Sequence, residues 1–135
     1  MAKFGRDDET WERMTDVGRS FLLERARLRR VTSYTELNIT LKNRTDLPGF
    51  DFTQADERAA MGHLLGLIVM KDFDATDLML SVLVHYLDAN DAGPGFYKLA
   101  EALGVLPRSA SSTAKERFWI THLNAVYDHY SPGER

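Results

Sequence analysis

The chain of 135 residues carries a formal net charge of −3, and 44% of its residues are hydrophobic. This length and composition exclude a disordered chain and indicate one packed core, so we expect a single domain over residues 1–135. The absence of cysteine excludes disulfides, thiolate zinc sites and cysteine nucleophiles.

The sequence also lacks signals for export and for membrane insertion. The first residues contain no apolar segment of signal-peptide length, and no apolar run approaches the ~18 residues of a membrane-spanning helix. We therefore expect a cytoplasmic protein with no membrane partner. The sequence carries no indication of the oligomeric state.

A long amphipathic helix is predicted over residues 8–30. Asp8 and Glu9 lie near its start and Arg29 and Arg30 near its end, which suits the helix dipole at both termini. Its apolar residues recur at intervals of three and four and form one stripe, which contains Trp11, Met14, Gly18, Phe21 and Leu22. The arginine-rich last turns are expected to project beyond the core.

The letters SYTE at residues 33–36 predict a capping box at the start of a second helix, which runs to about Asn43. In a capping box the serine hydroxyl accepts a hydrogen bond from the glutamate N–H, and the glutamate carboxylate accepts one from the serine N–H. A loop over residues 44–52 follows, because Pro48-Gly49 is a turn signal. We expect Phe50 and Phe52 to anchor this loop by packing inwards.

A third helix is predicted from a cap at Thr53 to about Lys71. Gly62 and Gly66 are four residues apart, so they share one side of this helix. Each interior glycine costs ~1 kcal/mol relative to alanine. We therefore expect these two glycines to allow another backbone to pack closely against the helix.

The next residues are predicted to form a loop, Phe73–Asp77, and then a strand, Leu78–Leu87. Both faces of this strand are largely apolar, which is typical of a strand covered on both sides, although a buried helix fits the same run. A turn then leads into a short helix, with Pro94 in its first turn and Gly104 as its left-handed cap. The last helix is predicted over residues 112–130.

Together these elements indicate a mainly α fold of the α+β kind, with about five helices and one short β element. A helix-helix-strand-helix core is expected over residues 33–104, between the long first helix and the last helix. The order of a long helix, a capped helix, a loop, another helix and a strand is also compatible with a winged-helix arrangement.

His85 is the histidine that best suits chemistry, because Tyr86, Asp88 and Asp91 follow it closely. Such a set can transfer protons, but no nucleophile or oxyanion element accompanies it. The other histidines form no metal-binding pattern and are expected to be structural or surface residues, and no dinucleotide or phosphate-loop motif is present. We therefore expect no cofactor, no metal site and no catalytic residue, with an enzyme site around His85 as an alternative.

Basic residues gather near the end of the first helix and the end of the second. The candidate nucleic-acid-binding residues are Arg25, Arg27, Arg29, Arg30, Lys42 and Arg44. Such side chains neutralise phosphates, which makes DNA the first expected partner. In a winged-helix geometry the third helix would read the major groove, but Asp56 and Glu57 in its first turn are unfavourable beside phosphates.

Three stretches carry a resemblance: YTELN at residues 34–38, DFTQADERAAMGHLLG at residues 51–66, and LMLSVLVHYLDANDAGPGFYKLAEALG at residues 78–104. Together they resemble small uncharacterised proteins of actinomycetes and their mobile elements, a likeness that implies no activity. The YTE of the first stretch and the RAAMG within the second also resemble the winged-helix half of alkyltransferase-like DNA repair proteins. The reactive-cysteine motif of that family is absent, so this likeness implies a fold and not alkyl transfer.

The sequence favours a small noncatalytic accessory or regulatory protein that acts on or near nucleic acid. An alternative is a protein-interaction module, such as an inhibitor or adaptor, that contacts no nucleic acid. Such a module would use the acidic stretch Asp72–Asp91 or an exposed apolar surface. A second alternative is an enzyme with a site around His85.

Overall fold

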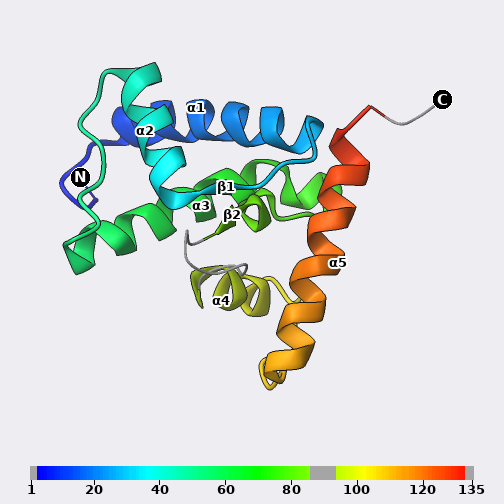
Figure 1. Ribbon diagram of the computed structural model, residues 1–135. Coiled ribbons are helices and arrows are strands. Elements are labelled where there is room, and N and C mark those ends of the chain that lie inside the picture. The colour runs from blue at the N-terminus through cyan, green and yellow to red at the C-terminus, as the bar shows by residue number, and fades with distance from the viewer. Residues whose placement is uncertain (1–2, 86–93, 133–135) are drawn as a thin grey trace.

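The computed structural model describes residues 3–85 and 94–132. In chain order its elements are α1 (Asp8–Arg27), β1 (Thr32–Ser33), α2 (Tyr34–Thr45), α3 (Ala55–Thr76), the 3₁₀ helix η1 (Leu80–Leu83), β2 (Val84–His85), α4 (Pro94–Ala102) and α5 (Ser112–Tyr130) (Figure 1). The predicted mainly helical class with a short β element is confirmed. In the described part of the chain, no helix combines the length and the hydropathy needed to cross a membrane.

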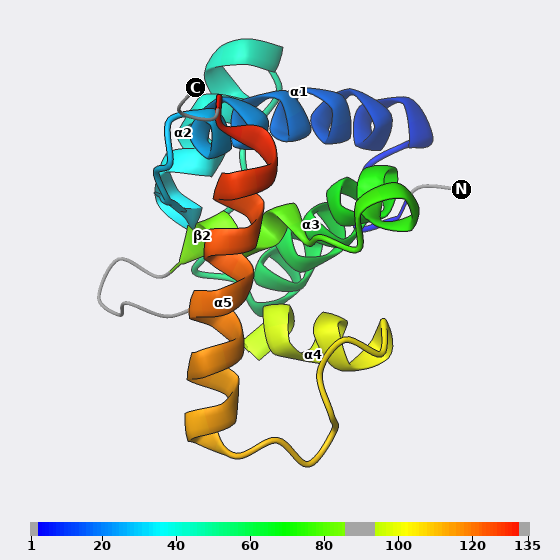
Figure 2. The same ribbon diagram turned by 90° about the vertical axis from the view of Figure 1, so that its right-hand side faces the viewer.

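The short helix η1 lies at the centre of the molecule. Its residues are at most 4% exposed, and α1, α3 and α5 all pack against it. α1 also packs on α2 and α3, while α5 runs from beside α4 to the C-terminal end of α1 (Figure 2). The core is therefore formed by helices packed around a buried 3₁₀ turn.

The strand predicted over Leu78–Leu87 is wrong for most of its described length. Leu80–Leu83 forms η1, and only Val84–His85 is a strand. The last two residues of the predicted strand lie outside the described residues. A run that is apolar at nearly every position has no clear period, so the pattern fits any element that is buried on all sides.

The second strand of the small sheet, β1, is not signalled by the sequence pattern because it is only two residues long. β1 and β2 pair in parallel, with Thr32 opposite Val84 and Ser33 opposite His85. A wing is an antiparallel hairpin, so this parallel pair is not a wing.

The first helix is shorter than predicted, because α1 ends at Arg27 and not at Arg30. Arg29 adopts a left-handed backbone conformation with a φ of 55°, which turns the chain away from the helix axis. The basic residues after Arg27 therefore lie in a turn and not on a projecting helix.

The third helix is longer than predicted, since α3 continues to Thr76 through most of the expected loop at Phe73–Asp77. Two tertiary contacts hold this extra turn. The side chain of Phe73 is buried, and Asp72 forms an ion pair with Arg19 of α1 at 2.7 Å. Packing against the rest of the molecule thus extends the helix beyond its local sequence preference.

Ser33 caps α2 as predicted, because its hydroxyl accepts a hydrogen bond from the Glu36 N–H at 3.0 Å. The carboxylate of Glu36 accepts a hydrogen bond from the Thr32 hydroxyl and lies 3.7 Å from the Arg25 guanidinium. Glu36 thereby links the start of α2 to β1 and to the last turn of α1.

The close contact between α1 and α3 is at Gly18, where an added Cβ would lie 2.8 Å from Cδ1 of Ile68. At Gly62 and Gly66 an added Cβ would meet nothing within 4 Å. The close backbone packing predicted at these two glycines is therefore wrong.

Candidate functional site

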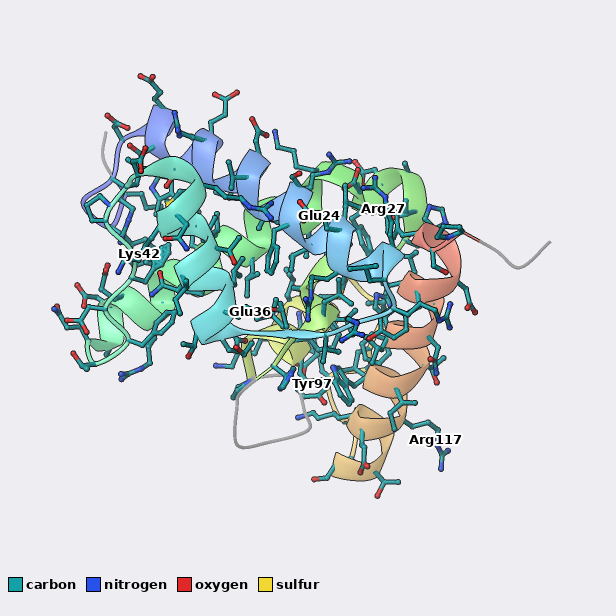
Figure 3. The ribbon with its side chains drawn as sticks, turned by 45° about the horizontal axis from the view of Figure 1, so that its top comes forward. Glu24, Arg27, Glu36, Lys42, Tyr97 and Arg117 are labelled. Atoms are coloured by element: carbon teal, nitrogen blue, oxygen red, sulfur yellow. The ribbon has the colours of Figure 1, made fainter. Side chains whose placement is uncertain are left out.

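The six predicted phosphate-binding side chains are spread over the surface formed by α1, α2 and the turn between them. Figure 3 shows Lys42 on α2 and Arg27 at the end of α1, at opposite ends of this surface. The aliphatic part of Lys42 lies against the loop after α2, since a Cβ on Gly49 would be 2.5 Å from Cδ of Lys42. These side chains therefore do not line one cationic groove.

The Arg25 side chain makes its contacts within the protein. Its guanidinium donates a hydrogen bond to the backbone oxygen of Val31 at 2.7 Å and lies over the ring of Phe21. It also faces the carboxylate of Glu36 at 3.7 Å, and its side chain is 24% exposed. Arg25 thus fixes the turn between α1 and β1, so the prediction that it contacts phosphate has no support in this geometry.

Arg44 forms a bidentate ion pair with Glu24. The two N–H···O distances are 2.7 and 3.1 Å, so the pair joins the end of α2 to α1. The hydrogen bonds from Arg44 lower the pKa of Glu24, which keeps this carboxylate charged. A phosphate would have to compete with a carboxylate that already occupies the edge of the guanidinium formed by Nη1 and Nη2.

Arg29 joins α1 to α5. Its guanidinium donates hydrogen bonds to Asp128 and Ser131, each at 3.1 Å, and lies 5.2 Å from the ring centre of Tyr127. Arg27 and Arg30, on either side of it, are exposed. The turn after α1 therefore presents two exposed arginines around one that is bound to the neighbouring helix.

A groove lies beside the small sheet, between β1 and the first turns of α2. We call it the β1–α2 groove; its volume is about 620 Å³, and its lining residues are Val31, Thr32, Ser33, Thr35, Glu36, Ile39, Thr40 and His85. Ile39 is apolar and yet 51% exposed. The inner face of α2 is formed by Leu37 and Leu41, so Ile39 lies off that face.

His85, the candidate for acid–base chemistry, lies in the wall of the β1–α2 groove, opposite Ser33 in the sheet. Its three proposed partners, Tyr86, Asp88 and Asp91, lie outside the described residues. No group of three His, Cys, Asp or Glu side chains within the described ranges is close enough to share a metal ion.

His122 is a core histidine whose hydrogen bond is satisfied. Its Nε2 accepts a hydrogen bond from the Met79 N–H at 2.8 Å, and its ring stacks on Phe118 at 5.1 Å between centroids. Burial lowers the pKa of His122 to about 4, so the ring is neutral at physiological pH. The predicted structural role is confirmed for this histidine.

One residue of the β1–α2 groove, Ile39, stands out in the sequence but is not among the predicted site residues. Ile39 is the apolar residue between Asn38 and Thr40 on a short helix whose inner stripe is already complete without it. An apolar side chain on the outer face of a helix is a signal for an interaction surface, but only when neighbouring elements form a depression around it. That depression depends on β1, which the sequence pattern does not predict.

The comparisons with known proteins add no relative. No protein family matches the chain, and neither does any curated protein or any solved structure. The resemblances to actinomycete proteins and to alkyltransferase-like proteins therefore stay predictions.

Proposed function

We propose that this chain is a noncatalytic protein-interaction module, an adaptor or inhibitor, whose partner binds in the β1–α2 groove. The observation that carries this proposal is the 51% exposure of Ile39 at the edge of an open groove of about 620 Å³. Thr35 and Thr40 provide hydrogen-bonding groups around this apolar side chain. An apolar centre with a polar rim is typical of protein–protein interfaces.

The charge of the groove supports a partner segment that is mainly apolar. Among the described lining residues Glu36 is the acidic one, and the Thr32 hydroxyl and the Arg25 guanidinium already balance its carboxylate. Charged residues are depleted at the centres of protein interfaces, because a buried charge without a partner is costly. A segment that places one apolar side chain against Ile39 fits this environment.

Site-specific photo-crosslinking tests this proposal. A photoreactive amino acid at position 35, on the groove, is compared with the same amino acid at position 121, which is exposed on α5. We expect one protein to crosslink at position 35 and not at position 121, and we expect Ile39→Asp to abolish that product without lowering the thermal unfolding midpoint. Equal crosslinking at both positions would contradict the proposal.

Nucleic-acid binding is the second candidate, and the exposed pair Arg27 and Arg30 favours it. These two arginines can approach phosphates without first breaking an ion pair that holds helices together. Duplex DNA binding that weakens by about tenfold or more between 50 and 200 mM salt, and that Arg27→Glu/Arg30→Glu removes, would support this candidate. Absence of binding at the lower salt concentration would exclude it.

A further inference from the structure

A second, narrower pocket lies between α3, η1 and α4, away from the β1–α2 groove. Its volume is about 100 Å³, and its walls include Gly62, Leu65, Gly66, Ser81, Gly95 and Phe96. None of the lining residues that the structure describes is charged. Apart from Tyr34, the described lining is otherwise apolar, and it contains one buried polar group without a hydrogen-bond partner, the Ser81 hydroxyl.

The three glycines keep this pocket open. An added Cβ at Gly62, Gly66 or Gly95 would meet nothing within 4 Å, so no other part of the described fold occupies the space beside them. Gly62 and Gly66 lie inside α3, where glycine stabilises a helix less than alanine does. Close packing therefore does not explain why these two positions of the helix are glycines. A pocket does explain it, because the methyl group of an alanine would reduce its volume.

The hydroxyl of Ser81 gives the pocket its chemical preference. Ser81 is 4% exposed, and its Oγ is a buried polar atom with no hydrogen-bond partner. Nearly all buried polar atoms in proteins have a partner, and leaving one without a partner destabilises the fold. A ligand with one donor or acceptor, placed within the apolar walls, would satisfy this hydroxyl.

We propose that this pocket binds a small neutral molecule with one aromatic ring or branched aliphatic group and one hydroxyl, of about the size of phenol. At about 100 Å³ the pocket is smaller than the enclosed cavity of about 150 Å³ that holds a benzene ring, but it is partly open, so one ring is the largest group that it can seat. The lack of charged residues sets the charge, because an ionised ligand would be buried without a counter-ion. Ser81 sets the requirement for one polar group.

Titrations with phenol and toluene, followed by amide NMR shifts, test this binding site. The two probes have nearly the same shape, but only phenol offers a hydroxyl. We expect saturable shifts in residues 62–66, 81 and 95–99, with phenol binding roughly 5- to 10-fold more tightly than toluene. In Ser81→Ala the preference for phenol is expected to be lost or reversed, because the phenol hydroxyl would be buried without a partner whereas toluene loses nothing.

Gly66→Ala tests the role of the glycines. We expect it to block both probes and also to raise the thermal unfolding midpoint by roughly 3–5 °C, because alanine favours the helix and its methyl group enters empty space. Gly62→Ala, one turn earlier, is expected to act in the same way. The control is Ser20→Ala on the exposed face of α1, which also favours a helix but must leave probe binding unchanged.

Several outcomes would overturn the proposal. Shifts that do not saturate would show that the pocket holds water only. Equal binding of phenol and toluene by the wild-type chain would remove the role of Ser81. Retained probe binding in both glycine variants, or loss of folding in Gly66→Ala, would show that the space beside these glycines is not the binding site.

Discussion

His122 shows most clearly how position in the fold sets the chemistry of a single residue. Its ring is 8% exposed, it stacks on Phe118, and it accepts the N–H of Met79. Burial disfavours the charged ring, so the folded chain holds His122 with a pKa of about 4, against about 6.5 for an unfolded chain. The neutral ring is therefore a structural part of the core.

This pKa predicts a loss of stability in acid. Below pH 6.5 the unfolded chain binds a proton at this position and the folded chain does not, so the free energy of unfolding falls as the pH drops from 6.5 towards 4. The contribution of His122 is on the order of 3 kcal/mol at pH 4. Urea unfolding of the wild type and of His122→Gln across this range measures it.

The variant separates this histidine from the carboxylates that also titrate near pH 4. The side-chain oxygen of glutamine can reach the position of Nε2 and accept the Met79 N–H, but it does not titrate, so His122→Gln is expected to lose less stability than the wild type between pH 6.5 and 4. His129→Gln, at an exposed position of α5, is the matched control and should behave as the wild type. Identical pH dependence in all three chains would contradict the structural role of His122.

The sequence predicts the role of His122 but not its partner. A histidine without a metal-binding pattern is expected to be structural, and this is confirmed at position 122. The donor, Met79, is 43 residues away along the chain, and only the packing of α5 against η1 brings the two together. Contacts of this kind depend on tertiary structure and leave no local pattern.

At the scale of elements, a side chain of α2 binds the loop between α2 and α3 through two hydrogen bonds. The amide of Asn38 donates to the backbone oxygen of Phe50 at 2.9 Å and accepts from the Phe50 N–H at 2.8 Å. Gly49 permits this arrangement, because a Cβ there would lie 2.7 Å from Oδ1 of Asn38. The Asn38 amide thus makes the two hydrogen bonds to Phe50 that a residue of a neighbouring strand would make. This fixes the loop to α2, and the side chain of Phe50 is buried.

This contact predicts that Gly49→Ala destabilises the chain by roughly 1–3 kcal/mol, because the new methyl group displaces the Asn38 amide from the Phe50 backbone. Urea unfolding measures the loss. If the displacement is the cause, Gly49→Ala adds little further loss to a chain that already carries Asn38→Ala. Fully additive losses in the double variant would contradict this mechanism.

Helices whose apolar residues recur at a clear helical spacing are the elements that the sequence predicts best. α1 and α5 have clear apolar stripes, and α5 has the predicted bounds. The inward packing of Phe50 is also confirmed. The segment around η1 is apolar at nearly every position, so its sequence contains no period that would distinguish a strand from a 3₁₀ helix. Local patterns therefore predict the outer elements and fail at the fully buried one.

At the scale of the whole molecule, ion pairs connect charged regions that look separate in the sequence. Arg19 on α1 and Asp72 on α3 form one such pair, with N–H···O distances of 2.7 and 2.9 Å. Arg29 and Asp128 form another between the turn after α1 and α5. Some side chains of the basic and acidic stretches thus form ion pairs that join helices. These side chains contribute less charge to the binding of a partner.

The β1–α2 groove is likewise a property of the whole molecule. Its lining comes from the turn after α1, from β1 and α2, and from β2, which is about 50 residues further along the chain. The sequence offered the basic residues as the more visible candidate site, because charge clusters are apparent without a structure. An exposed isoleucine becomes informative only when the surrounding elements are in place.

Affinity capture with charge and apolar variants compared side by side tests the central claim most directly. The measurement uses a nuclease-treated lysate and quantifies the proteins retained by the wild type, Ile39→Asp, Arg27→Glu/Arg30→Glu and Met70→Asp, the last being a control at an exposed apolar residue of α3. We predict that Ile39→Asp alone loses the protein that crosslinks at position 35. Retention of that protein by Ile39→Asp, together with its loss from the double arginine variant, would contradict the account.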